Sequence, residues 1–234
     1  MVDGIDGSGK TLQSQLLCER LTALGHTVRT PSFPRYDHES SYFVRKLLRG
    51  GFEKQGGAQP HIASMMYAFD RMDASEELAS QLEQGDILVS NRYTSSNVGH
   101  QGGRIDHLKE RKAYYAWLDH FEHDQLRIPR PDIVLYLHVT VDTALTMIHQ
   151  SFLEERRESK DLYDTREHLQ KAYQSYNEAA GLFAYWRTVE CMESDQFLPP
   201  EVIAERIWEE ILPVLHAHGQ EVSLRSQATR ATGA

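Results

Sequence analysis

The chain has 234 residues, 40% of them hydrophobic, which is enough to bury the core of one α/β domain. Its net charge of −9 argues against a general nucleic-acid-binding protein, because a phosphate backbone requires a basic surface. The two cysteines form neither a disulfide framework nor a zinc-binding spacing. No apolar run approaches the about 20 residues of a membrane span, and no signal peptide is evident, so we expect a cytoplasmic protein with no membrane partner.

Helical and strand patterns alternate along the chain, which favours a parallel sheet with helices on both faces. A very short first strand is expected before Gly4, where only three residues stand, so this strand is either clipped or begins upstream. No linker divides the chain, which predicts a single domain over 1–218 and a disordered tail over 219–234. Further strands are expected at 26–30, 86–90, 133–139 and 186–192. Helices are expected at 10–25, 39–49, 61–84, 107–127, 142–150, 162–180 and 200–217.

The most specific motif lies at residues 4–11, which match G-x-x-x-x-G-K-[ST] at every fixed position. The glycines let backbone N–H groups surround a phosphate chain, and the dipole of the following helix also favours anions. Lys10 is placed to reach the β- and γ-phosphates, and the Thr11 hydroxyl to hold Mg²⁺. The predicted ATP-binding residues are Gly4, Ile5, Asp6, Gly7, Ser8, Gly9, Lys10 and Thr11.

Three arginine-containing clusters follow strands or lie between them. They read FPRY at 33–36, YAFDR at 67–71 and NRY at 91–93. Ligands of open α/β sheets bind beyond the carboxyl ends of the strands. Arginines at two such ends suit the bidentate capture of a second phosphate, which the glycine loop does not hold. Surface ion pairs remain the alternative for each arginine.

Six motifs in order, GIDGSGKT, FPRY, YAFDR, NRYTSSN, IPRPD and DLYD, together resemble the thymidylate kinase family over about residues 1–215. The resemblance implies a P-loop NTPase fold: a three-layer sandwich with a doubly wound, five-stranded parallel sheet, helices on both faces and a small lid at about 151–160. It also implies transfer of the γ-phosphoryl group of ATP to dTMP with Mg²⁺, a step in dTTP synthesis. The family further implies a homodimer.

The resemblance also implies roles for individual residues around the thymine base. Tyr67 would stack on the ring, while Arg71 and Asn97 would hydrogen-bond to its edge. His100 stands near the 2′ position of the sugar, where many bacterial members carry another residue, so it bears on sugar selectivity. The full implied substrate set is Asp6, Phe33, Arg35, Tyr67, Arg71, Arg92, Ser96, Asn97, His100 and Tyr163.

Around the phosphates, the resemblance implies that Arg35 and Arg92 grip the 5′-phosphate of dTMP. Asp6 would bind the 3′-hydroxyl of the deoxyribose and lie near the metal ion. Asp161 would lie near the acceptor, and a lid arginine could stabilise the transferring phosphoryl group. The implied catalytic set is Lys10, Asp6, Arg92, Arg156 and Arg157, and the implied metal set is Thr11, Asp6 and Asp164.

Asn91 departs from the family, which usually has an acidic residue there to support Mg²⁺. Two alternatives to a dTMP kinase stay open, and Asn91 supports the second of them. A deoxynucleoside kinase would need a carboxylate base near a 5′-hydroxyl and would have less use for Arg35. A nucleotide-binding protein that has lost catalysis would explain the amide at Asn91.

Overall fold

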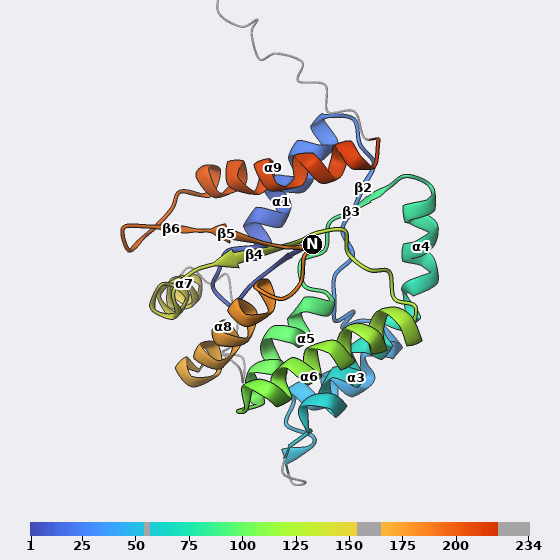
Figure 1. Cartoon of the computed structure of the whole chain (residues 1–234), viewed down its shortest axis with the longest axis vertical. Coiled ribbons are helices and arrows are strands. Elements are labelled where there is room, and N and C mark those ends of the chain that lie inside the picture. The colour runs from blue at the N-terminus through green and yellow to red at the C-terminus, as the bar shows by residue number, and fades with distance from the viewer. Residues whose placement is uncertain (54–56, 154–164, 220–234) are drawn as a thin grey trace, which may run out of the picture.

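The computed structural model describes residues 1–53, 57–153 and 165–219. At its centre lies a parallel sheet in two parts, with helices on both sides (Figure 1). The first part has the strand order β1-β4-β5, and the second pairs β2 with β3. The bounds of the strands are Val2–Asp3 for β1, Val28–Arg29 for β2, Ile87–Leu88 for β3, Val134–His138 for β4 and Trp186–Glu190 for β5.

The two parts of the sheet meet at isolated bridges rather than along paired strands. Asn91, just after β3, bridges in parallel to Val2 and to Ser32. β1 has only two residues and pairs along its length with β4, while on its other side the Val2 N–H donates to the Ser90 carbonyl at 3.0 Å. The predicted parallel arrangement with helices is therefore present, but the described residues do not form one continuous five-stranded sheet.

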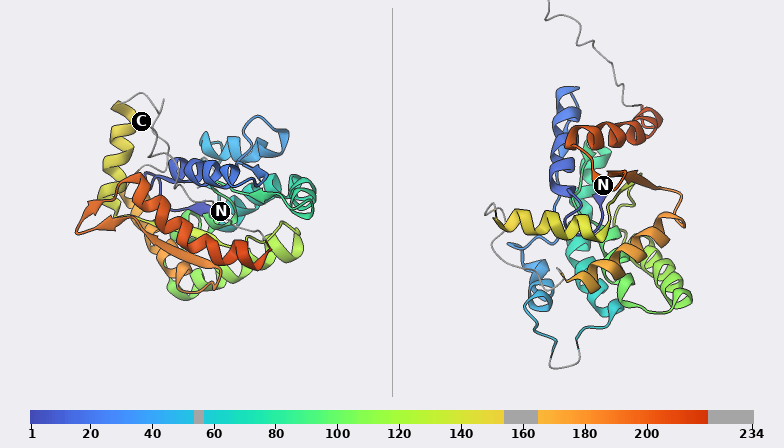
Figure 2. Two further views of the ribbon diagram at one scale, coloured as in Figure 1. Left: turned by 90° about the horizontal axis from the view of Figure 1, so that it is seen from above. Right: turned by 90° about the vertical axis from the view of Figure 1, so that its left-hand side faces the viewer.

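Helices cover both faces of this sheet. α1 (Lys10–Ala23) and α9 (Pro200–Ala217) lie side by side on one face, and α5 (Thr94–His100) and α8 (Arg166–Ala180) pack together on the other (Figures 1 and 2). The other helices are α2 Tyr42–Leu48, α3 Pro60–Asp73, α4 Ser75–Glu83, α6 Leu108–Asp119 and α7 Val141–Leu153, with 3-10 turns at Glu39–Ser41 and Gly102–Arg104 and a π-helical turn at His120–Gln125.

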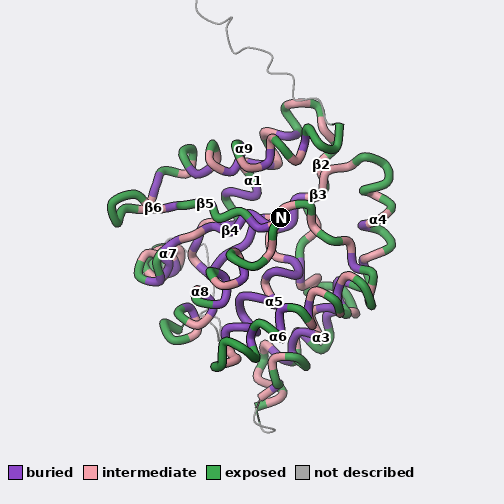
Figure 3. Tube along the Cα trace, viewed as in Figure 1, coloured by how far each residue is buried: buried purple, intermediate pink, exposed green. Residues whose placement is uncertain are grey.

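The core is centred on β4, which is buried on both faces of the sheet (Figure 3). Leu135 and Leu137 of β4 belong to the same buried apolar cluster as Leu21 of α1. The ring of Tyr136 stacks on that of Tyr176 in α8, with ring centroids 5.3 Å apart. This packing fixes the central strand, and with it the loop that follows its neighbour β1.

α5 approaches α8 closely because residue 99 is a glycine. A Cβ atom at Gly99 would lie 2.1 Å from the ring of Tyr176, far inside van der Waals contact. The close approach holds α5 against α8, and α5 carries three of the predicted site residues, Ser96, Asn97 and His100.

The elements differ from the sequence prediction in three places. The predicted helix 61–84 is interrupted at Ala74, where α3 ends and α4 begins, without a glycine or proline to mark the break. α5 and a short antiparallel hairpin, β6 (Met192–Glu193) with β7 (Gln196–Phe197), were not predicted. The predicted lid and tail fall mostly outside the described residues. No helix in the described ranges is long and apolar enough to cross a bilayer.

Candidate functional site

The glycine-rich loop connects β1 to α1 at the carboxyl end of the sheet. Gly7 and Gly9 adopt left-handed backbone angles, with φ of 84° and 88°, which glycine tolerates without steric cost. The Lys10 ammonium group folds back over the loop and donates to the carbonyl oxygens of Gly4 at 2.9 Å and Ile5 at 2.8 Å. These two hydrogen bonds hold the Lys10 ammonium group against the loop.

An ion pair joins the loop to the end of the neighbouring strand. The Arg92 guanidinium, just after β3, donates to the Asp6 carboxylate, and the Lys10 ammonium lies 3.6 Å from the same oxygen. Burial alone would raise the pKa of Asp6, but the charges of Arg92 and Lys10 outweigh it and hold this pKa well below its usual range. The candidate site thus contains two cations around one carboxylate.

Burial acts on the lysine in the opposite direction. It is the main cause that lowers the pKa of Lys10 from 10.5 to about 8, and the charge of Arg92 adds to it, against the opposing charges of Asp6 and Asp3. The pKa of Arg92 is raised, because Asp6 and Asp3 outweigh the effect of its burial. At neutral pH the site therefore keeps both positive charges.

His100 adds a neutral ring beside Arg92. A guanidinium group can only donate, so His100 accepts at Nε2 from Arg92 Nη1, 3.1 Å away, and carries its proton on Nδ1, which lies 3.0 Å from Nε2 of His168. Burial lowers the pKa of His100 from 6.5 to about 3, and Arg92 and His168 add to this against Asp6. The ring is therefore uncharged throughout the physiological range.

The candidate metal position lies beside Thr11. The Asn91 side-chain amide donates to the Thr11 hydroxyl at 3.1 Å, while its Oδ1 atom is buried and has no hydrogen-bond partner among the described residues. Mg²⁺ prefers oxygen ligands and keeps several waters, so an unpaired amide oxygen next to a hydroxyl fits a hydrated ion. No cluster of three or more histidine, cysteine or acidic side chains suited to a metal occurs in the described part of the chain.

A cavity of about 100 Å³ opens next to the Asp6–Arg92 ion pair. Side chains from the ends of β2 and β3, from α3 and from α5 line it, and they include most of the residues predicted to bind a nucleoside monophosphate. Those predicted residues are Asp6, Phe33, Tyr67, Arg71, Arg92, Ser96, Asn97 and His100.

Two of the polar residues that line this cavity share a buried carboxylate. Arg71 donates from Nε and Nη2 to the two oxygens of Glu122, both at 2.7 Å. The Asn97 amide nitrogen donates to the same carboxylate at 3.0 Å and to the Ser64 carbonyl at 3.2 Å. The Glu122 side chain is fully buried, so α3, α5 and the π-helical turn are held together beneath the cavity.

A family model described as thymidylate kinase matches residues 2–192. The chain belongs to the thymidylate kinase family. This membership implies a P-loop NTPase α/β fold, in agreement with the parallel sheet and its glycine-rich loop.

Named relatives are similar to this chain at modest identity. Human thymidylate kinase is 30% identical over 144 residues, which cover 62% of each chain. The thymidylate kinase of Mycobacterium tuberculosis is 26% identical over 143 residues, covering 61% of this chain and 66% of that protein. A probable thymidylate kinase of Thermococcus kodakarensis is 27% identical over 209 residues, covering 87% and 94%. The match thus spans less than two thirds of the human and mycobacterial proteins.

Arg35 lies differently from the other residues that the family resemblance implies. Its guanidinium donates to Asp70 at 3.2 Å and to Asp73 at 2.6 Å, both on α3, and also to Ser40 at 2.8 Å. It is not among the residues that line the cavity. A role for Arg35 at a 5′-phosphate therefore requires the guanidinium to leave these partners, and it stays a prediction.

Some predicted residues lie outside the described ranges, and two buried carboxylates were missed. The predicted residues outside are Arg156, Arg157, Asp161, Tyr163 and Asp164. The missed carboxylates are Asp3 and Glu122. Asp3 accepts hydrogen bonds from Ser96 and Tyr176, and Glu122 accepts from Arg71. The signal for Glu122 was its place four residues after the buried Leu118 of α6, in the π-helical turn that continues this helix, where a buried charge needs a partner.

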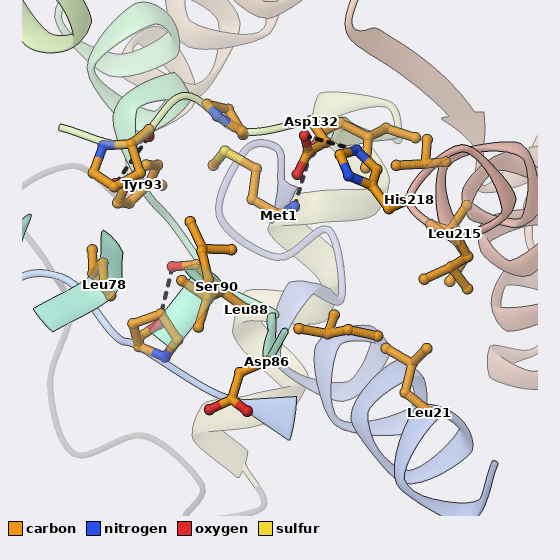
Figure 4. Close-up of a pocket in the computed structure, with 18 of the residues that line it drawn as sticks. Met1, Leu21, Leu78, Asp86, Leu88, Ser90, Tyr93, Asp132, Leu215 and His218 are labelled. Atoms are coloured by element: carbon orange, nitrogen blue, oxygen red, sulfur yellow. Dashed lines mark hydrogen bonds and ion pairs between the residues drawn. The ribbon is translucent and has the colours of Figure 1, made fainter. Parts of the chain in front are cut away.

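A larger cavity of about 290 Å³ lies beside β3, lined by Met1 and Asp86 near the starts of β1 and β3 and by Ser90 and Tyr93 after β3 (Figure 4). Its walls are mainly apolar and include Met1, Leu21, Leu78 and Leu215. None of the residues predicted for the site lines it. We therefore assign the candidate active site to the smaller cavity beside the glycine-rich loop, because that is where the charged groups converge.

The low pKa of Lys10 leads to a test of the loop. In the unfolded chain this lysine titrates near pH 10.5, so between pH 8 and pH 10.5 the folded state has already released the proton. The unfolding free energy of the wild-type protein should therefore rise relative to Lys10→Met across this window, by at most about 3 kcal/mol. Urea denaturation of both proteins measures the difference, and ¹³C NMR of the lysine side chains measures the titration. A Lys10 that titrates with the surface lysines would contradict the burial described above.

Proposed function

We propose that the protein transfers the γ-phosphoryl group of ATP to dTMP, giving dTDP. The observation that carries this proposal is the Asp6–Arg92 ion pair, because it lies between the glycine-rich loop and the cavity lined by Tyr67, Arg71 and Asn97. A nucleotide with its phosphates on the loop and a monophosphate with its base in the cavity would meet at this pair. Phosphoryl transfer needs such an alignment more than it needs covalent chemistry.

Lys10 and Arg92 supply the positive charge for this reaction. In the free protein both cations have partners within the chain: two loop carbonyls for Lys10, and Asp6 for both. Phosphate oxygens can replace these partners without leaving the cations unpaired, so binding avoids much of the desolvation cost of a buried charge. Cations fixed in this way stabilise the charge that develops on the transferring group.

The proposal includes Mg²⁺, which neutralises phosphate charge when it is bound. Thr11 would hold it through its hydroxyl, and Asn91 through a bound water at its unpaired oxygen. Asp6 lies in the same site and would contribute negative charge. The roles of Asp164, of the lid arginines and of Tyr163 stay predictions, as do a single domain over 1–218 and a cytoplasmic location.

An ADP-release assay with a panel of acceptors tests the reaction. We expect dTMP to be phosphorylated with a kcat/KM at least about a hundredfold above that of thymidine, because thymidine leaves Arg92 without a phosphate to pair with. We expect Lys10→Ala to abolish nearly all transfer. Similar kcat/KM values for thymidine and dTMP would instead favour a deoxynucleoside kinase. Binding of both nucleotides without any turnover would favour a protein that has lost catalysis.

Asn91 gives a second test, which concerns the metal. Asn91→Asp places a carboxylate beside Thr11, so it should lower the Mg²⁺ concentration needed for the half-maximal rate by about three- to tenfold. A Mg²⁺ titration with saturating ATP and dTMP measures this. Asn177→Asp adds the same charge on α8, where the Asn177 amide oxygen accepts from Tyr136, and it should leave the Mg²⁺ requirement unchanged. An equal response of the two variants would refute a metal position at Asn91.

We also propose that the protein forms a homodimer through α3. This helix exposes Ile62, Phe69 and Met72 on one side, and the ring of Phe69 lies 6.4 Å from that of Phe121, which continues the apolar surface. Light scattering should give twice the chain mass for the wild-type protein and the chain mass for Phe69→Glu. Leu182→Glu, which changes an exposed leucine outside this surface, should stay dimeric. A monomeric wild-type protein would exclude the dimer.

A further inference from the structure

Glu122 lies beneath the smaller of the two cavities, which we call the base cavity, but it does not line this cavity. Its carboxylate accepts three hydrogen bonds, two from Arg71 and one from Asn97, and the side chain is fully buried. Both donors line the cavity, whereas Glu122 does not. The hydrogen-bonding groups that Arg71 and Asn97 can offer to a ligand are therefore those that their contacts with Glu122 leave over.

The contacts of Asn97 fix which way round its amide lies. Its two partners are the Glu122 carboxylate and the Ser64 carbonyl, and both can only accept. Only the NH₂ end of the amide can satisfy them, and it has two hydrogens for two acceptors. The amide oxygen Oδ1 therefore remains for a ligand in the cavity, and it can only accept.

Arg71 is also fixed by Glu122, but it keeps donors free for a ligand where Asn97 keeps an acceptor free. Its Nε and Nη2 atoms are held by the two oxygens of Glu122, which leaves the Nη1 hydrogens as donors for a ligand. The cavity thus offers one donor, from Arg71, next to one acceptor, from Asn97. A base edge that fits must present an acceptor next to a donor.

We propose that Glu122 is the positioning residue that sets this pattern and so selects thymine over cytosine. Thymine presents its C4 carbonyl oxygen as an acceptor next to its N3–H donor, which matches Arg71 and Asn97. Cytosine presents an amino donor next to the unprotonated N3 acceptor, so it would face both side chains with like groups. The inference rests on the proposed function, because it concerns the base of the same acceptor. Uracil has the same edge as thymine, so Glu122 does not separate dTMP from dUMP.

A glutamine at this position would break the pattern while keeping the size of the side chain. Its amide has one accepting end, whereas the three hydrogen bonds from Arg71 and Asn97 use both carboxylate oxygens. An NH₂ group in place of Oε2 faces Arg71 Nε, and one in place of Oε1 faces both Arg71 Nη2 and Asn97, so at least one donor must turn away. If Asn97 turns, its NH₂ group faces the N3–H donor of thymine but the N3 acceptor of cytosine, so the preference for thymine over cytosine falls.

The experiment compares Glu122→Gln with the wild-type protein on dTMP, dCMP and ATP. We expect the KM for dTMP to rise roughly tenfold or more and the dTMP-to-dCMP ratio of kcat/KM to fall by at least as much, with the KM for ATP within about twofold. Glu178→Gln is the matched control. Glu178 also holds an arginine, Arg111, with two hydrogen bonds of 2.7 Å, but neither residue lines the cavity. The control should alter neither value.

A merely structural ion pair would give a different result. Glu122→Gln would then lower the midpoint of thermal unfolding but leave the KM for dTMP and the selectivity as in the wild-type protein, which would overturn the inference. If the variant does not fold, Glu122→Asp keeps the charge and withdraws it by one methylene, and it should change KM and selectivity in the same direction. NMR of the unmodified protein gives a further test, because the Asn97 side-chain amide should be protected from solvent exchange with and without dTMP.

The failure of this inference can be told apart from the failure of the proposed function. If only this inference is wrong, the wild-type protein phosphorylates dTMP, and the Glu122→Gln variant has the same base selectivity as the wild-type protein. If the proposed function fails, the wild-type protein phosphorylates neither dTMP nor dCMP. Calorimetric binding of dTMP and dCMP still tests the role of Glu122 in that case, and equal affinities of the wild-type protein for the two would overturn it.

Discussion

The arrangement of the site depends on the ion pair between Asp6 and Arg92. Each residue follows a different strand, β1 or β3, and the sheet itself joins these strands only near Val2 and Asn91. The pair therefore fixes the glycine-rich loop relative to the base cavity where backbone pairing is sparse. It also supplies the partly buried Arg92 guanidinium with an anionic partner, which offsets part of the cost of its desolvation.

The same principle recurs on the base side, where Glu122 balances the buried Arg71. In both places a carboxylate engages part of a guanidinium group and leaves the rest for a ligand. The anions differ in position, however. Asp6 lines the cavity and can exchange its partners for phosphate, whereas Glu122 lies below it and keeps them. Phosphate binding can thus rearrange one pair, while base recognition rests on a fixed one.

The sequence could predict the residues whose place is set by local spacing. Lys10 and Thr11 follow from the loop motif, and Arg92 and Asn97 from a motif at a strand end. It could not predict the partners of Arg35 or Arg71, because Asp70 and Glu122 come from other elements and only tertiary packing brings them together. The helix break at Ala74 was missed because no glycine or proline marks it, whereas the very short β1 was expected from the three residues before Gly4.

Protonation in the free site is governed by Lys10 rather than by histidine. His100 is the group expected from its type to titrate near neutral pH. Its burial beside Arg92 moves its pKa to about 3, so it stays neutral and serves as an acceptor for the guanidinium. Lys10, with a pKa of about 8, is then the group at the loop whose pKa lies nearest to neutral pH. Bound phosphates would add negative charge around this lysine and raise its pKa again, so a nucleotide would itself restore the charge with which the lysine binds it.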